Sequence, residues 1–157
     1  MGWIGSGNDR DQTLRVLPDI AATFDALYQS FWTQPHLPAG ILELCRLRLA
    51  QLHGSAVDMQ RHDFEIPSDK RNNLTHWDTH HSISAAERAC LAFTEVYAMD
   101  VQALTDEHAA EVKAHFGDEG LVLLVEALGI LDGMTRLSLL WQFPAHTSEQ
   151  SAVGTSP

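Results

Sequence analysis

The chain has 157 residues and a formal net charge of −11, with 10 lysines and arginines against 21 aspartates and glutamates. Hydrophobic residues make up 45% of the chain and charged residues 20%, which is typical of one globular domain and excludes an intrinsically disordered protein. An acidic chain repels phosphate backbones and anionic lipid surfaces, so we expect neither nucleic acid nor a membrane among its partners.

Residues 1–16 are polar and glycine-rich, which predicts a flexible N-terminal arm. Acidic residues stand where the apolar core of a signal peptide would lie: Asp9, Asp11, Asp19 and Asp25. We therefore expect no export signal and a cytoplasmic location. The two cysteines, Cys45 and Cys90, lie far apart in apolar helical segments, so we expect both to be reduced residues of the core.

The spacing of apolar residues predicts a helix over residues 18–33, with Pro18 in its first turn. A second helix is expected over residues 38–52. It is apolar almost all round, which predicts burial on more than one side. A third helix is predicted to begin at Ser55. The polar stretch 64–82 is expected to be a loop with at most one helical turn.

Capping signals mark the helices in the second half of the chain. A capping-box pattern that begins at Ser84 starts a fourth helix, which reaches about Met99. Thr105 caps a fifth helix, which Gly117 ends. The last helix is predicted over residues 118–141, with acidic residues in its first turn as the helix dipole prefers.

No segment shows the alternation of a β-strand, so the predicted fold class is all-α. We expect one compact multi-helix domain over residues 17–143 and a disordered tail over residues 144–157. The last helix is long and apolar for a domain of this size. Its surface, with Trp141 and Phe143, favours burial against another subunit and therefore a homo-oligomer.

The candidate catalytic site lies around the second and third helices and consists of Glu43, Ser55, Asp58 and His62. Ser55, Asp58 and His62 stand at positions i, i+3 and i+7, which predicts that they project from one helix face. Glu43 lies within an apolar helix, where an ionised carboxylate needs a partner or a raised pKa. If the two helices meet, Glu43 and His62 would share a sheltered cleft as an acid/base pair.

Three stretches carry a resemblance to a known family: Glu43–Gly54, Glu87–Glu95 and His115–Glu119. Over residues 31–141 the chain resembles the carboxymuconolactone decarboxylase / alkylhydroperoxidase-D-like superfamily of small helical proteins. The resemblance implies that compact helical fold, and it implies Glu43 and His62 as the acid/base pair. Family members are commonly trimers or higher oligomers, so a dimer, trimer or hexamer is expected.

In the peroxidase branch of this family a glutamate is followed by a Cys-x-x-Cys pair and then by a histidine. When Glu43 and His62 are matched to the first and last of these, the two cysteine positions fall on Ser55 and Asp58. A serine does not form the reactive thiolate that dithiol chemistry needs. We therefore expect a thiol-independent acid/base enzyme, of lyase or isomerase type, that acts on a small oxygenated molecule without a cofactor.

In this prediction Glu43 is the general acid or base, His62 is its partner, and Ser55 and Asp58 orient the substrate or a water molecule. Simpler interpretations of the same residues stay open. Ser55 and Asp58 also match a capping box, and Asp58 and His62 match an ordinary pair on a helix face. Glu43 could pair with Arg46 at i+3 and have no other role. Glu43, Asp58 and His62 could together bind a metal ion.

Two further functions also stay open at this stage. One is a non-catalytic helical oligomer that binds a small molecule or a partner protein. The other is residual peroxidase activity through Cys45 or Cys90. Histidines in the polar loop are a second group of possible metal ligands, although a solvated loop explains them more simply: His76, His80 and His81.

Overall fold

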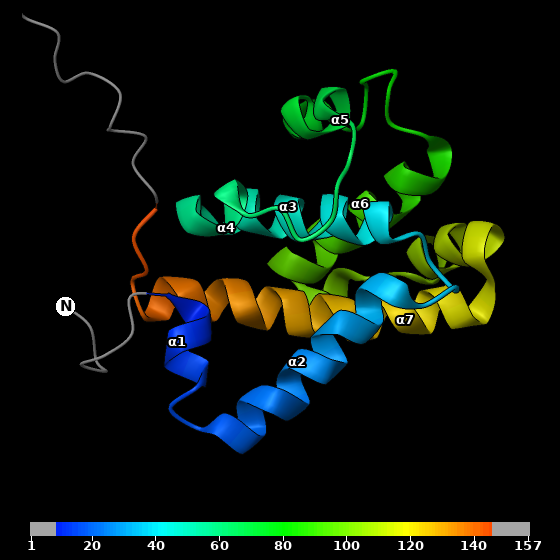
Figure 1. Cartoon of the computed structure of the whole chain (residues 1–157). Coiled ribbons are helices and arrows are strands. Elements are labelled where there is room, and N and C mark those ends of the chain that lie inside the picture. Colours follow the sequence, from blue (N-terminus) through cyan, green and yellow to red (C-terminus); the bar gives the residue numbers. More distant parts are fainter. Residues whose placement is uncertain (1–8, 146–157) are drawn as a thin grey trace, which may run out of the picture.

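The computed structural model describes residues 9–145, and every regular element in this range is a helix (Figure 1). The elements in chain order are α1 (Arg10–Leu14), α2 (Pro18–Thr33), α3 (Ala39–His53), α4 (Ala56–Gln60), α5 (Ser68–Asn72), η1 (Leu74–His76), α6 (Ala85–Met99), η2 (Val101–Ala103) and α7 (Asp106–Leu140). The predicted all-α class is confirmed.

The core lies where α3, α6 and α7 pack against one another. Figure 1 shows α7 running beneath α3 and α4 along most of the molecule, with α2 crossing its middle and α1 beside its C-terminal end. Nine of the 15 residues of α3 are buried, as its nearly continuous apolar sequence predicts. Helix α3 is therefore the central element, and polar side chains on it must find partners inside the protein.

The helix ends follow the capping signals in the sequence. At the start of α6 the Ser84 Oγ accepts the Glu87 N–H at 3.2 Å, and the Glu87 carboxylate accepts the Ser84 N–H at 2.8 Å. The Thr105 side chain caps α7. Gly117 has a positive φ of 68° and separates two helical segments within α7, so its predicted role as a helix end is confirmed locally.

A close approach next to this interruption fixes how α7 meets the connection between α2 and α3. A Cβ atom built on Gly120 would lie 3.2 Å from the backbone oxygen of His36 and 2.2 Å from the Cβ of Phe116. Only glycine leaves room for this contact. The two predicted helices thus follow each other directly, with a kink at Gly117 between them.

Two segments are more ordered than expected. Residues 10–14, predicted to be part of a flexible arm, form α1, which the Asp9 side chain caps and in which Arg10 and Thr13 are buried. The predicted loop 64–82 contains both α5 and η1 rather than at most one turn.

The predicted tail begins at residue 144, and its greater part lies outside the described residues. Within residues 9–145, no helix combines the length and the apolar character that crossing a bilayer requires. The domain limits expected from the sequence, residues 17–143, stay a prediction.

Two glycines allow a stability test with opposite expected signs. Gly54 ends α3 with a φ of 67°, whereas Gly133 lies inside α7, and a Cβ on either residue would meet no atom within 4 Å. We expect Gly54→Ala to lower the free energy of unfolding by about 1 kcal/mol because alanine is strained at positive φ. Gly133→Ala, the matched control, should raise it by up to about 1 kcal/mol through helix propensity. Urea unfolding of both variants measures the difference, and two changes of the same sign would contradict it.

Candidate functional site

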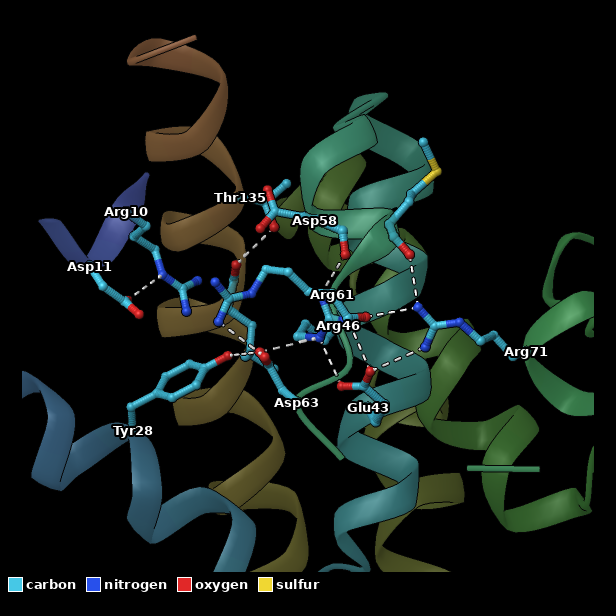
Figure 2. Close-up of polar contacts among 12 residues, drawn as sticks. Arg10, Asp11, Tyr28, Glu43, Arg46, Asp58, Arg61, Asp63, Arg71 and Thr135 are labelled. Atoms are coloured by element: carbon cyan, nitrogen blue, oxygen red, sulfur yellow. Dashed lines mark hydrogen bonds and ion pairs between the residues drawn. The ribbon is translucent and has the colours of Figure 1, made fainter. Parts of the chain in front are cut away.

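The buried guanidinium of Arg46 is the centre of the polar residues on α3. Its Nε donates to Glu43 Oε2 at 2.8 Å and its Nη2 donates to Glu43 Oε1 at 2.8 Å, which makes a two-pronged ion pair (Figure 2). Glu43 is completely buried and Arg46 is 3% exposed. Burial alone would lower the pKa of Arg46, but the hydrogen bond and the charge of Glu43 outweigh it and raise that pKa. The guanidinium of Arg46 therefore keeps its charge.

The same guanidinium determines where α4 ends. Arg46 Nη1 donates to the Asp58 carbonyl and Nη2 to the Arg61 carbonyl, both at 2.8 Å. Arg71, from α5, donates to the Met59 and Arg61 carbonyls, also at 2.8 Å. These carbonyls are the acceptors that a continuing helix would use for its own N–H groups. Helix α4 therefore stops at Gln60.

This early end changes the predicted helix face. Arg61 has extended backbone angles, with φ −70° and ψ 149°. His62 consequently lies beyond α4 and is exposed, while Ser55 and Asp58 remain buried at and within α4. The prediction that Ser55, Asp58 and His62 project from one face of a single helix is wrong, because arginine side chains from α3 and α5 replace the helical hydrogen bonds.

The expected contact between Glu43 and His62 is also not formed. The charged groups that the described residues bring to the Glu43 carboxylate are Arg46 and, at 3.5 Å, Arg71 Nη1. The exposed imidazole of His62 is not among its partners. The sequence had no signal for this outcome beyond the i, i+3 spacing of Glu43 and Arg46, which is a common pairing on a helix.

Ser55 and Asp58 bind each other rather than capping α4. The Ser55 Oγ donates to Asp58 Oδ2 at 2.5 Å, and the serine makes no side-chain hydrogen bond to the helix N-terminus. Ser55 does occupy the N-cap position that the capping-box interpretation predicts, but the hydrogen bonds of a capping box are not formed. The two positions that a Cys-x-x-Cys pair would occupy thus hold a hydroxyl–carboxylate pair.

Asp63, which the sequence analysis did not select, replaces Glu43 as the carboxylate beside His62. It accepts a very short hydrogen bond from the Tyr28 hydroxyl, and its Oδ1 accepts from Arg61 Nη2 at 3.0 Å. Arg46 Nε lies 3.5 Å from its Oδ2. Figure 2 shows Tyr28 reaching from α2 towards Asp63, with Arg46 on the far side of the carboxylate.

The charge states of this pair follow from its surroundings. Burial would raise the pKa of Asp63, but the nearby Arg46 and Arg61 guanidiniums and the Tyr28 hydrogen bond hold it below its ordinary value. Burial, together with the charge and the hydrogen bond of Asp63, raises the pKa of Tyr28 well above its usual range. Asp63 is therefore ionised at neutral pH, and Tyr28 keeps its proton.

These groups line a cavity of about 240 Å³ between α1, α2 and the segment after α4, which we call the α2 cavity. Tyr28, Asp63, His62, Arg61 and Arg10 all border it, so it brings an imidazole, a phenol, a carboxylate and two guanidiniums together. The Arg10 guanidinium also lies over the Tyr28 ring, 5.3 Å from its centre.

A second cavity of about 410 Å³, the α4 cavity, lies on the other side of Arg10 and Arg61. Its wall includes Val57 and Asp58 from α4 and Phe143 from the segment after α7. Of the four predicted site residues, His62 borders the α2 cavity and Asp58 borders the α4 cavity. Glu43 and Ser55 support these walls from inside the protein.

Neither thiol is placed for reactivity. Cys45 and Cys90 are both fully buried in the core. Burial, the largest cause, raises the pKa of Cys45 to about 12, and burial together with nearby Cys45 raises that of Cys90 still further. Among the described residues, no three side chains of His, Cys, Asp or Glu gather so that they could hold a metal ion. The loop histidines and the Glu43, Asp58 and His62 set therefore gain no support as metal sites.

Comparison with family models gives no match, and comparison with curated protein sequences gives none either. Solved structures do match. The debrominase Bmp8 superposes without ligand at a TM-score of 0.75 and 18% identity, covering 87% of this chain and 76% of Bmp8. A cysteine-to-alanine variant of Bmp8 in complex with 2,3,4-tribromopyrrole superposes at 0.74 and 18% identity, covering 87% and 75%.

A third match is a protein of unknown function from Agrobacterium tumefaciens, described as an antioxidant defence protein, AhpD. It superposes at a TM-score of 0.75 and 19% identity, covering 94% of this chain and all of that one. At such identities the likeness establishes the fold and not the activity. The likeness agrees with the resemblance seen in the sequence, and the chain shares the all-helical, alkylhydroperoxidase-D-like fold of these structures.

Proposed function

We propose that this protein is a thiol-independent acid/base enzyme, of lyase or isomerase type, that acts on a small oxygenated molecule in the α2 cavity. The observation that carries the proposal is the meeting of His62 with the hydrogen-bonded Tyr28–Asp63 pair on the walls of one cavity. The fold is compatible with small-molecule chemistry, because Bmp8, which shares it, is a debrominase solved with a bromopyrrole.

In this proposal His62 transfers the proton. Histidine is the side chain that most readily gains and loses a proton near neutral pH, and His62 reaches the cavity from an exposed position. Its imidazole would remove a proton from carbon next to a carbonyl and later return it. The negative charge that then develops on the carbonyl oxygen would face the guanidiniums of Arg10 and Arg61.

Asp63 and Tyr28 are positioning residues in this scheme. The ionised carboxylate holds the phenol and the Arg61 guanidinium through separate oxygens, so it fixes two walls of the cavity relative to each other. Glu43 acts one step further away. It holds Arg46, which in turn lies beside Asp63 and binds the backbone of the α4 segment. Ser55 orients Asp58 in the adjoining cavity.

The burial of both thiols gives residual peroxidase activity no support, because the attacking species in that chemistry is an exposed thiolate. A non-catalytic binding protein is the second candidate. Two contacts favour it: the ion pair of Glu43 with Arg46 and the hydrogen bond between Ser55 and Asp58. Through these contacts, the side chains at the positions that match the peroxidase site bind other residues of the protein.

We also propose that the chain forms homo-oligomers. Large apolar side chains stay exposed on α2 and on the turn before it, namely Val16, Leu17, Ile20 and Leu27. Leu139 and Leu140 are exposed near the end of α7. Sedimentation equilibrium should give a mass above that of one chain, and a monomer at all concentrations would contradict the proposal.

Proton transfer can be measured without knowing the physiological substrate. We expect the protein to accelerate the exchange of C–H protons next to the carbonyl of pyruvate, acetoacetate or an unsaturated lactone in D₂O, followed by proton NMR. His62→Gln should slow the catalysed exchange about 100-fold, because general acid/base groups typically contribute that much or more. Thiol alkylation should leave the rate unchanged.

The matched control is His115→Gln, because His115 is exposed on α7 and borders neither cavity described above. It should exchange protons at the wild-type rate. Failure to accelerate exchange with any of the three compounds, or equal rates for wild type and His62→Gln, would count against catalysis and favour the binding protein.

The lowered pKa of Asp63 predicts a dependence of stability on pH. A carboxyl group whose pKa is lower in the folded protein than its ordinary value of 3.8 stabilises the fold above that value and loses this contribution as the pH falls through its folded pKa. The free energy of unfolding should therefore fall as the pH drops from about 5 through the folded pKa of Asp63, which lies below 3.8. In Asp63→Asn the fall should be smaller, and in Asp78→Asn, which alters an exposed loop residue, it should match wild type. Equal slopes for wild type and Asp63→Asn would show that Asp63 is not held in its ionised form.

A further inference from the structure

The buried nitrogen atoms without acceptors cluster around the two cavities. Among the described residues, the buried side-chain nitrogen or oxygen atoms that lack a hydrogen-bond partner are Arg10 Nε, Trp32 Nε1, Arg61 Nε and Arg71 Nη1. All four are donors. Arg71 Nη1 has a charge partner in Glu43, and the other three belong to residues that border the α2 cavity. These three nitrogen atoms therefore lack acceptors even though Asp11, Asp25 and Asp63 also border the α2 cavity.

Arg10 is the least satisfied of these residues. Its side chain is 7% exposed, and its one ion pair with a described residue is a long contact of 3.9 Å between Nε and Asp11 Oδ1. No hydrogen bond from its guanidinium to a described residue is formed, although it lies over the Tyr28 ring. A buried donor without an acceptor is costly, because it has lost its hydrogen bonds to water without replacement. A ligand with an anionic oxygen would remove this cost.

The position of Arg10 shows what else the ligand must contain. Arg10 and Arg61 border both cavities and so stand between them. The α4 cavity has apolar walls at Val57, Phe143 and Pro144. At about 410 Å³ its volume falls in the range that small-molecule sites usually occupy. A head group at the arginines would thus continue into an apolar space.

Carboxylates already present on the walls limit the charge of the ligand. Asp9 and Asp58 border the α4 cavity, but each has a donor of its own, the Gln12 N–H at 2.8 Å and the Ser55 hydroxyl at 2.5 Å. They do not neutralise Arg10, yet they would repel a second negative charge placed beyond it. The α4 cavity therefore suits an apolar tail and not a second carboxylate.

We propose that Arg10 and Arg61 bind the head group of a monocarboxylate whose apolar chain fills the α4 cavity. This inference rests on the proposed function, because it places the carboxylate end of the ligand beside His62 and Tyr28 in the α2 cavity, and it names the class of molecule that the site takes. Guanidinium groups recognise carboxylates through charge-assisted, paired hydrogen bonds.

The test is calorimetric titration of the full chain with hexanoate, hexanol and adipate. Hexanoate should bind at least about tenfold more tightly than hexanol, which lacks the charge, and than adipate, which carries a second carboxylate. Arg10→Met keeps the apolar stem and removes the guanidinium, and it should weaken hexanoate binding about tenfold or more. Arg15→Met, at an exposed position in the turn after α1, is the matched control and should bind like wild type.

Val57→Phe tests the tail separately and leaves both arginines in place. It should weaken octanoate far more than butyrate, because the added ring fills the α4 cavity beyond the head group. Circular dichroism establishes that each variant is folded, and if Arg10→Met does not fold, Val57→Phe and the three-ligand series decide the matter. Equal affinity for hexanoate and hexanol, or unchanged octanoate binding in Val57→Phe, would overturn the proposal.

The two proposals fail separately. Proton exchange that depends on His62, with no hexanoate binding, would remove the carboxylate ligand and leave the acid/base enzyme standing. Hexanoate binding that depends on Arg10, with no exchange activity, would support the ligand class in a protein without catalysis.

Discussion

One buried cation, the guanidinium of Arg46, holds this part of the molecule together. It donates four hydrogen bonds, to both oxygens of Glu43 and to the carbonyls of Asp58 and Arg61, and it forms an ion pair with Asp63. Each contact would be weak at the surface, but a buried carboxylate such as that of Glu43 would lose its solvation without replacement if the guanidinium were absent. Removing a single partner from such a buried set lowers the free energy of unfolding by about 3–5 kcal/mol, so these residues depend on one another. Arg46 extends from the buried helix α3 and, through its hydrogen bonds to the Asp58 and Arg61 carbonyls, positions the backbone at the end of α4.

The site therefore consists of buried charged residues and of residues that border a cavity. Groups behind the wall, Glu43 and Arg46, are charged but hidden. Groups in front of it, Tyr28, His62 and Asp63, reach a cavity. Arg10 and Arg61 border both cavities, and the aspartates that line these cavities are Asp9, Asp11, Asp25, Asp58 and Asp63. The charge that a ligand would meet is therefore set by these residues and not by the overall charge of −11.

Much of the fold could be predicted from local signals. The apolar spacing located α2 and α3, and the capping patterns at Ser84 and Thr105 located α6 and α7, because these signals act within one or two turns of the chain. The site was harder. The end of α4 depends on Arg46 from the preceding helix and Arg71 from the following one, and no local pattern around residue 61 announces either. Asp63 was missed for the same reason, since Tyr28, its partner, is 35 positions away. Of the four residues chosen from the sequence, Asp58 and His62 border a cavity, and tertiary contacts, not helical spacing, decide this.

The ion pair between Arg46 and Glu43 also limits what two cysteines at positions 55 and 58 could restore of the dithiol motif. Placing cysteines at positions 55 and 58 would recreate the motif on paper. It would not recreate its surroundings, because the carboxylate at position 43, the one the resemblance assigns to proton transfer, would still have both oxygens held by a cation. Freeing the Glu43 carboxylate would need a third change, at position 46. That change would also release the backbone carbonyls that Arg46 binds at the end of α4. Two cysteines alone would therefore leave the carboxylate and the course of this segment as they are.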